Sequence, residues 1–120
     1  MKPTITSLRP FLGAQNFEQS QAFYKELGFE ETVIDQTMSV FKIDAFAFYL
    51  QRAYVKDWVD NTMLFLEVSD PESVLQEVLK KDLPSRYPKV RVSKMVYTDW
   101  GMEFFVHDPS GILWHIGSFK

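Results

Sequence analysis

Two histidines near the end of the chain, His107 and His115, are well suited to chemistry, because imidazole binds metals and exchanges protons near neutral pH. Both lie in the stretch DWGMEFFVHDPSGILWHIGS, residues 99–118, where a turn at 108–111 separates two apolar runs rich in aromatic residues. His115 falls where the second run is expected to be most buried. His107 lies next to the turn and is predicted to be an exposed polar residue.

Other catalytic chemistries find little support in the sequence. The chain has no cysteine, which excludes disulfides, thiolate zinc sites and cysteine nucleophiles. No serine lies in a G-x-S-x-G context, and there is no glycine-rich phosphate loop. Glu67, Asp70 and Glu72 are interpreted as helix-start and surface charges. No pairing of a histidine with a carboxylate can be asserted from spacing alone.

Composition narrows the class of protein. The 120 residues, 46% of them hydrophobic, predict one folded domain spanning 1–120. Thirteen basic against 16 acidic residues argue against nucleic acid as a partner, because that binding needs excess Lys and Arg. The absence of a long apolar run or a signal-peptide pattern predicts no membrane segment and a cytoplasmic location. The 16% aromatic residues fit either a Phe-rich core or an aromatic-lined pocket.

A weak internal repeat organises the chain. Residues 12–20, LGAQNFEQS, align with residues 66–74, LEVSDPESV, and in each segment a strand-like run leads into a helix start. Asn16 and Asp70 are good N-caps, and Pro71 is placed at a first helical position. The pattern predicts helices at about 17–26 and 71–81, with Gly28 ending the first.

Three short strands are predicted after each helix. They span roughly 30–35, 38–43 and 46–51 in the first half, and 90–97, 103–107 and 112–117 in the second. Residues 82–89, with two prolines, are predicted to be an irregular connection. The element order is β-α-β-β-β twice, in modules of about 1–55 and 56–120. This order predicts an α+β fold with two curved, mostly antiparallel sheets and outer helices, and excludes a doubly wound parallel sheet.

The stretch FEQSQAFYKELGFEE, followed by a second module ending in FFVHDPSGILWHI, resembles the vicinal oxygen chelate superfamily over essentially the whole chain. That superfamily includes glyoxalase I, ring-cleaving dioxygenases and the bleomycin resistance proteins. The chain is most similar to the last group, in RPFLGAQNFEQSQAFY with its strand proline, in LGFEETVID, in VDNT at 59–62 and in WGMEFFVHDPSGILWHI. The resemblance implies a glyoxalase/bleomycin resistance-like fold.

Enzymes of this superfamily hold a divalent metal near the first and last strands of each half. The corresponding positions here are Arg9, Met63, Tyr49 (less certainly Gln51) and His115. Arginine stays protonated and cannot ligate, and Met and Tyr are poor partners for a hard divalent ion. We therefore expect no metal and no cofactor, and interpret His115 as the histidine of a pocket without a metal.

In the bleomycin resistance proteins, the function is sequestration of a flat cationic antibiotic. A dimer formed by exchange of the first strand builds two crevices between its subunits. The resemblance implies a ligand site that includes Trp100, Phe65, Met38, Val33, Gln51, Asp60 and His115. Trp100 stands where those proteins have a stacking tryptophan, whereas Val33 and Met38 replace crevice phenylalanines and Gln51 replaces a serine. These replacements leave open whether the ligand is bleomycin or another flat aromatic compound.

Three functions remain compatible with the sequence. The favoured one is a metal-free binding protein of the bleomycin resistance type, acting as a homodimer on a small, flat, aromatic and cationic molecule. The second is a metal-dependent lyase or dioxygenase of the same superfamily, with its ligands at other positions. The third is a domain that dimerises without a small ligand. Pro10 favours the dimer, because a proline in the first strand removes a hydrogen-bond donor and suits a strand that leaves its own subunit.

Overall fold

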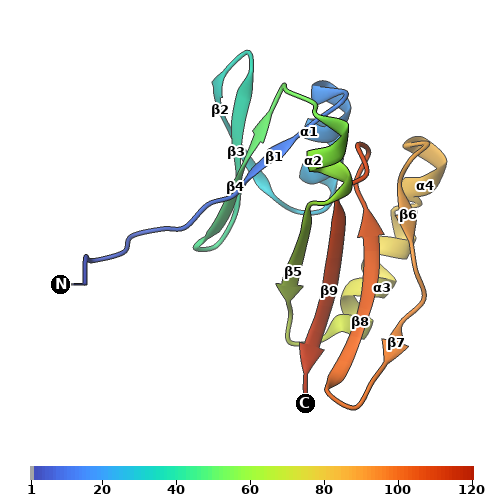
Figure 1. Ribbon diagram of the computed structural model, residues 1–120. Coiled ribbons are helices and arrows are strands. Elements are labelled where there is room, and N and C mark those ends of the chain that lie inside the picture. Colours follow the sequence, from blue (N-terminus) through green and yellow to red (C-terminus); the bar gives the residue numbers. More distant parts are fainter. Residues whose placement is uncertain (1) are drawn as a thin grey trace.

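The computed structural model describes residues 2–120, and its two sheets each come from one half of the chain (Figure 1). The first sheet has the order β1-β4-β3-β2, and the second has the order β5-β9-β8-β6, with β7 also paired to β8. Only β1 with β4 and β5 with β9 pair in parallel among the described strands, which confirms two mostly antiparallel sheets. The strands are β1 (Phe11–Gly13), β2 (Glu30–Asp35), β3 (Met38–Ile43), β4 (Phe46–Gln51), β5 (Met63–Glu67), β6 (Arg91–Val92), β7 (Val96–Tyr97), β8 (Gly101–His107) and β9 (Leu113–Phe119).

The two long helices begin at the predicted caps. Helix α1 (Phe17–Glu26) starts where the Asn16 side chain accepts a hydrogen bond from the backbone N–H of Gln19, at 3.0 Å. Helix α3 (Pro71–Lys80) starts with the equivalent bond from Ser73 to Asp70, at 3.2 Å. Both predicted ranges are confirmed to within one residue. No helix of the described chain is long and apolar enough to cross a membrane.

Gly28 ends α1 in the way that its position predicts. Its φ of 108° lies in the left-handed region, which a residue without Cβ adopts at little cost. The N–H of Gly28 donates to Lys25 and the N–H of Phe29 donates to Tyr24, the paired bonds of a Schellman motif. The chain thereby turns directly into β2.

Four details differ from the predicted elements. Residues 52–62, for which no element was predicted, contain the short helix α2 (Lys56–Asp60), and the connection at 82–89 contains α4 (Leu83–Arg86). The strand predicted at 90–97 is broken into β6 and β7, because the Ser93 hydroxyl accepts the N–H of Phe105 where a backbone carbonyl would normally do so. Strands β8 and β9 each extend two residues beyond the prediction, to Gly101 and Phe119.

The internal repeat is present in three dimensions. Phe11 of β1 pairs with Tyr49 of β4, and Phe65 of β5 pairs with His115 of β9. Since Phe65 is the repeat equivalent of Phe11, Tyr49 and His115 occupy equivalent places in the two sheets. In both pairs the two rings are stacked.

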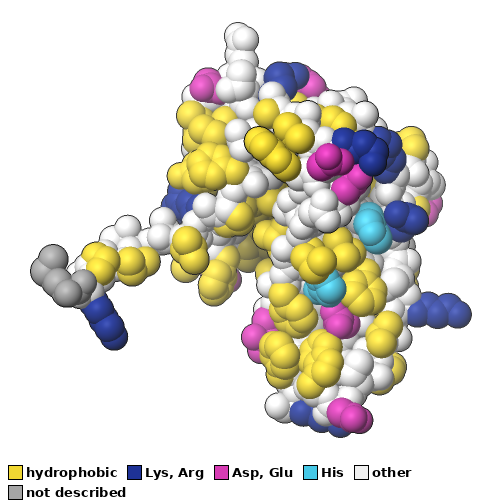
Figure 2. Space-filling model, viewed as in Figure 1, with side chains coloured by type: hydrophobic (Ala, Val, Ile, Leu, Met, Phe, Trp, Pro, Cys, Tyr) yellow, Lys and Arg dark blue, Asp and Glu magenta, His cyan; other side chains and the backbone are white. Residues whose placement is uncertain are grey.

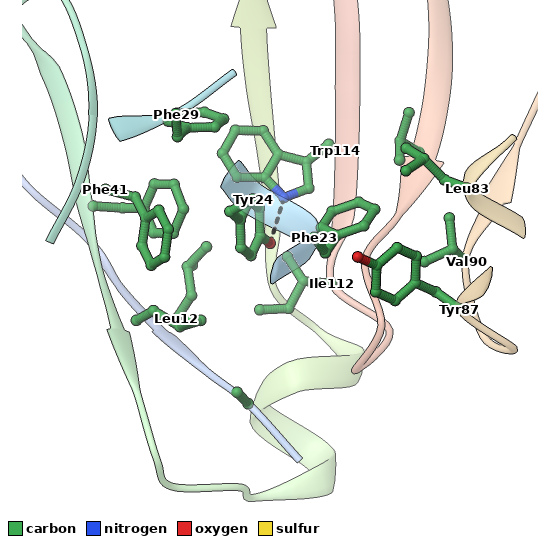
Figure 3. Close-up of a cluster of buried hydrophobic side chains, with 14 of the residues drawn as sticks. Leu12, Phe23, Tyr24, Phe29, Phe41, Leu83, Tyr87, Val90, Ile112 and Trp114 are labelled. Atoms are coloured by element: carbon green, nitrogen blue, oxygen red, sulfur yellow. Dashed lines mark hydrogen bonds between the residues drawn. The ribbon is translucent and has the colours of Figure 1, made fainter. Parts of the chain in front are cut away.

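Aromatic side chains fill the core that joins the two halves (Figure 3). Tyr24 of α1 lies at its centre, with its ring 4.8 Å from Phe48 and 5.8 Å from Trp114 between centroids. Its hydroxyl oxygen accepts a hydrogen bond from Trp114 Nε1 and donates one to the buried Asp108. Each sheet therefore has one face turned to the core and the helices, and an opposite face, called here its open face.

Candidate functional site

The open face of the second sheet carries most of its exposed aromatic and titratable side chains. Trp114 and Ile116 of β9 point into the core, so the alternate residues of that strand point the other way. The pairing of β5 and β8 with β9 brings their alternate residues to the same face. These residues are Met63, Phe65, Glu67, Glu103, Phe105, His107, Leu113, His115, Gly117 and Phe119. Figure 2 shows both histidines on this face among hydrophobic side chains.

Three aromatic rings form a surface at one end of this face. Phe65, Trp100 and Phe119, called here the aromatic patch, have centroid separations of 6.3, 5.4 and 5.1 Å. They remain 43, 38 and 58% exposed. Rings held this close and left in solvent provide a ready platform for a flat aromatic compound. The structure thus brings together Phe65 and Trp100, two of the predicted site residues, and adds Phe119.

His115 lies next to the aromatic patch and is hydrogen-bonded to Glu103. Its Nδ1 is 2.7 Å from Glu103 Oε1, and the two side chains are 23 and 13% exposed. The His115 ring is stacked with Phe65 at 6.2 Å and meets Phe105 edge-on at 5.0 Å. Its Nε2 is buried without a hydrogen-bond partner among the described residues. The sequence placed His115 at the most buried part of the run; the side chain is partly buried, because it points to the open face and not to the core.

Gly117 accounts for the path of the Glu103 side chain. Glu103 pairs with Gly117 across the β8–β9 hairpin. A Cβ on Gly117 would lie 2.8 Å from Glu103 Cβ and 2.3 Å from the Met102 carbonyl oxygen, both too close for a real side chain. Because Gly117 has no side chain, Glu103 has room to extend toward His115, which lies two residues before Gly117 on β9.

A second, smaller group lies on the open face of the first sheet. Phe11 and Tyr49 are stacked at 4.6 Å with an interplanar angle of 19°, and the Arg9 guanidinium lies 5.7 Å from the Tyr49 centroid. Met38 pairs with Gln51 at the end of β3 and β4, and both are half-buried. Predicted residues of the two halves are therefore on two separate sheets.

Two predicted site residues are not brought to either group. Val33 pairs with Ser39, a buried residue, so it points to the helix side of the first sheet. Asp60 belongs to α2, where it forms an ion pair with Lys56 at 2.6 Å. It precedes β5 at the start of the second sheet, whereas Trp100 accepts a hydrogen bond from Lys120 at the far end. Within one chain, Asp60 and Trp100 occupy opposite ends of this sheet.

His107 differs from its prediction as an exposed residue. It is half-buried at the end of β8 and pairs with Arg91 of β6. Burial, followed by the positive charge of Arg91, lowers its pKa from the ordinary value. The neutral imidazole is therefore the favoured form near neutral pH.

An apolar cavity of about 330 Å³ lies between the two sheets. Aromatic side chains dominate its wall, with Phe46 and Phe48 from β4, Trp114 from β9 and Phe65 from β5. The aromatic patch as a whole is not enclosed by this cavity. In a single chain the patch is open surface.

The donor set at the four positions that correspond to a metal site does not suit a divalent ion. Arg9 and Tyr49 lie together on the first sheet, with the guanidinium near the ring. Met63 and His115 lie on the open face of the second sheet, and His115 Nδ1 is already bonded to Glu103. Among residues 2–120, no three His, Asp or Glu side chains are grouped so that they could hold a metal. An arginine and a methionine offer no oxygen or imidazole ligand to such an ion.

Glu103, Phe105 and Phe119 are site residues that the sequence patterns did not single out. The alternation in GMEFFVH places Glu103 and Phe105 on one face of a strand. The turn at 108–111 sets the register that brings this face beside His115. A hairpin register drawn through that turn is the signal that could have found the pair.

Comparison with protein-family models and with curated proteins finds no match. Solved structures do match. A bleomycin-binding protein from bleomycin-producing Streptomyces verticillus, complexed with copper(II)-bleomycin, is 22% identical with a TM-score of 0.81, covering 99% of this chain and 100% of that one. A bleomycin resistance determinant encoded on the transposon Tn5 is 19% identical with a TM-score of 0.75, covering 95 and 98%.

A third similar structure is a glyoxalase/bleomycin resistance protein from Catenulispora acidiphila. It is 19% identical, has a TM-score of 0.75 and covers 97% of this chain and 100% of its own. At these identities the likeness establishes the fold, because one fold serves many functions. The chain has the glyoxalase/bleomycin resistance fold that its sequence predicts.

Proposed function

We propose that this protein is a small-molecule binding protein of the bleomycin resistance type. It sequesters a flat, aromatic, positively charged compound in a crevice between two copies of the chain, and it does no chemistry on that compound. The aromatic patch is the single observation that carries the proposal. Three rings within 6.3 Å of one another remain 38–58% exposed in the single chain, and they suit stacking on a flat ligand.

A second copy of the chain supplies the other wall of the crevice. The aromatic patch is open surface in one chain, whereas small-molecule sites are usually concave pockets or clefts. Residues 2–8 have no regular structure, are exposed and extend away from both sheets (Figure 1). Within them Leu8 is 91% exposed, an unfavourable state for a leucine in water. Exchange of this segment between two copies would cover it, while Phe11–Gly13 of β1 stay paired with β4 of their own chain.

The proposed site works without a metal or a cofactor. Of the four metal-equivalent residues, only His115 is a good ligand for a divalent ion, and its Nδ1 is held by Glu103. Arg9 stays protonated and has no lone pair to offer a metal. This donor set supports binding over metal-dependent lyase or dioxygenase chemistry.

Bleomycin itself and related flat compounds are the candidate ligands. Two solved proteins of this fold, one from S. verticillus and one encoded on Tn5, are described as bleomycin-binding and as a bleomycin resistance determinant. The remaining predicted residues, Met38, Gln51, Val33 and Asp60, are proposed to contact the ligand from the partner chain or from the crevice rim. The proposed location is the cytoplasm.

A thermal-shift screen tests this proposal. The purified protein is melted with bleomycin and with other flat cationic antibiotics, and with non-aromatic cations as controls. A ligand at 100 times its Kd should raise the free energy of unfolding by about 2.7 kcal/mol. No stabilisation by any flat compound would contradict the proposal, and stabilisation by a divalent metal bound once per chain would favour the lyase or dioxygenase alternative.

A further inference from the structure

Glu103 places a carboxylate beside the aromatic patch. The side chain is 13% exposed, and its Oε1 is bonded to His115 Nδ1 at 2.7 Å. No hydrogen bond joins Oε2 to any other of residues 2–120, and this oxygen is not among their buried unpaired atoms. A carboxylate can accept several hydrogen bonds, so Glu103 keeps unused acceptor capacity beside the patch.

Three carboxylates lie near the aromatic patch. Glu67 of β5 and Glu103 of β8 both pair with Gly117, one on each side of it, on the same open face. Asp99 directly precedes Trp100. Two lysines are also near: Lys120 is exposed at the end of β9, and Lys94 is exposed two residues before the Val96 that pairs with Glu103. Arg91 lies at the opposite end of β8 beside His107.

His115 fixes the position of this carboxylate. The hydrogen bond at Nδ1 and the contacts of the ring with Phe65 and Phe105 leave the imidazole little freedom. Glu103 is thus held in place in advance of binding, which reduces the entropy lost when a ligand binds. Near a partly buried site, a fixed carboxylate also attracts a positive charge more strongly than it would in water.

We propose that Glu103, positioned by His115, determines the charge specificity of the aromatic patch: it selects a flat aromatic cation over a neutral ring of the same shape. The inference rests on the proposed function and names the residue that recognises the charge. The rings of Phe65, Trp100 and Phe119 bind the flat system whatever its charge. The carboxylate then favours the cation, and the electron-rich ring faces act in the same direction.

A matched pair of probes separates these two contributions. The probes are 10-methylacridinium, which is permanently charged, and acridine, which has nearly the same shape and is neutral just above neutral pH. Each is titrated into the intact protein while tryptophan fluorescence is followed. The parent should bind the cation about tenfold more tightly than acridine, as expected for one fixed charge near the surface of a protein.

Glu103→Gln is the decisive variant. The amide oxygen of glutamine can still accept the hydrogen bond from His115, so the fold and the aromatic patch are kept, as a melting curve would verify. The preference for 10-methylacridinium should fall several-fold, to the smaller preference that the ring faces supply, with the affinity for acridine unchanged. Glu72→Gln, an exposed change in the first turn of α3, is the control and should keep the full preference.

The outcomes distinguish this inference from the function on which it rests. If neither acridine probe binds the parent, the proposed function itself fails at this face. If both bind with equal affinity, or if Glu103→Gln keeps the preference, aromatic binding stands and the role of Glu103 is overturned. Loss of the preference in Glu67→Gln but not in Glu103→Gln would assign the charge recognition to the other carboxylate and would equally overturn the inference.

Discussion

Tyr24 joins three separate segments of the chain through one hydroxyl group. The hydroxyl donates to Asp108 Oδ2 at 2.6 Å and accepts from Trp114 Nε1 at 2.9 Å. Asp108 Oδ1 also accepts the backbone N–H groups of Ser110, Gly111 and Ile112, which form the turn between β8 and β9. Burial and the neighbouring Asp108 carboxylate raise the pKa of Tyr24 well above its ordinary value, so it stays a neutral donor.

Tyr24→Phe should destabilise the protein by about 1–3 kcal/mol, the cost of leaving buried polar groups without a partner. The change leaves both the indole N–H and one Asp108 oxygen unpaired. Urea denaturation followed by circular dichroism measures the loss. Tyr97→Phe, at an exposed tyrosine of β7, is the matched control and should change stability by less than about 0.5 kcal/mol.

Trp100→Ala should weaken any ligand of the aromatic patch by about 1–3 kcal/mol, because a stacking partner is lost. The residue is 38% exposed and its main aromatic neighbours are the other two rings of the patch, so the fold should remain. Titration of a ligand found in the thermal-shift screen measures the effect. An unchanged affinity together with a stability loss of about 3–5 kcal/mol would make Trp100 a core residue and not a binding residue.

Trp58 offers a control within the same chain. It is 73% exposed on α2, away from the aromatic patch. Trp58→Ala removes an indole of the same size and should leave the affinity of the same ligand unaltered. An equal loss in both variants would show that the effect is not specific to the patch.

His115→Ala should leave the metal content of the purified protein near zero and instead reduce ligand affinity. The variant removes the ring that contacts Phe65 and holds Glu103, whereas the other metal-equivalent residues offer no suitable ligands. Elemental analysis of protein purified without chelator measures the metal. A stoichiometric metal in the parent that disappears in the variant would refute a site without metal.

At the scale of elements, the Glu31 side chain of β2 links α1 to the first sheet through hydrogen bonds. Its Oε2 accepts hydrogen bonds from Gln21 of α1 at 2.6 Å and from Ser39 of β3 at 2.7 Å, and Lys25 lies 3.4 Å away. Burial raises the pKa of Glu31, but the bonds from Ser39 and Gln21 and the charge of Lys25 outweigh it, so the pKa is lowered overall. The carboxylate therefore stabilises the fold only while it is ionised.

Glu31→Gln should cost about 1–2 kcal/mol at neutral pH, as charged hydrogen bonds are lost. Because the pKa of the folded state is lowered, this stabilisation is present above the ordinary carboxylate pKa and disappears as the pH falls through the folded value. Urea midpoints of parent and variant should thus converge on acidification. A difference in urea midpoint that stays constant across pH would contradict the role of the charge. Glu30→Gln, at the exposed neighbouring residue, is the control, and its urea midpoint should equal that of the parent at every pH.

The long elements could be predicted because their signals are local. Asn16 and Asp70 cap α1 and α3 with their own side chains, and Gly28 ends α1 through its own backbone. The short helices carry no such signal. The residue before α2, Val55, has no side-chain cap, and Asp82 before α4 takes a left-handed φ of 49° without capping.

The candidate site could be predicted only in part, because its contacts depend on strand register. Trp100, Phe65 and His115 were expected, and the structure brings their rings together. The Glu103–His115 pair depends on the β8–β9 hairpin and on the space left by Gly117, which no local pattern contains. Phe119 joins the patch because β9 continues past its predicted end.

At the scale of the whole molecule, exposed apolar residues favour assembly. Ile5 and Leu8 of the extended segment, Phe46 of β4 and Met63 of β5 are all largely exposed. Covering such side chains with a second copy would remove apolar surface from water, which is favourable. Two copies related by a twofold axis could cover the segment of each chain with the other.

Sedimentation of the parent over a dilution series should therefore detect a homodimer. Leu8→Asp places a charge in the exchanged segment and should shift the equilibrium toward monomer. The stability of the isolated chain should hardly change, because Leu8 is 91% exposed in it. A parent that is monomeric at every concentration would contradict both the dimer and the crevice between subunits.

The most direct test of the central claim is sedimentation velocity of the protein with a flat, absorbing aromatic cation, observed at a wavelength where only the ligand absorbs. The ligand should sediment together with the dimer, at one molecule per chain. With the Leu8→Asp variant, the ligand should no longer sediment with the protein. A ligand that stays unsedimented beside the parent, or moves equally with a monomer, would contradict sequestration in a crevice between two copies.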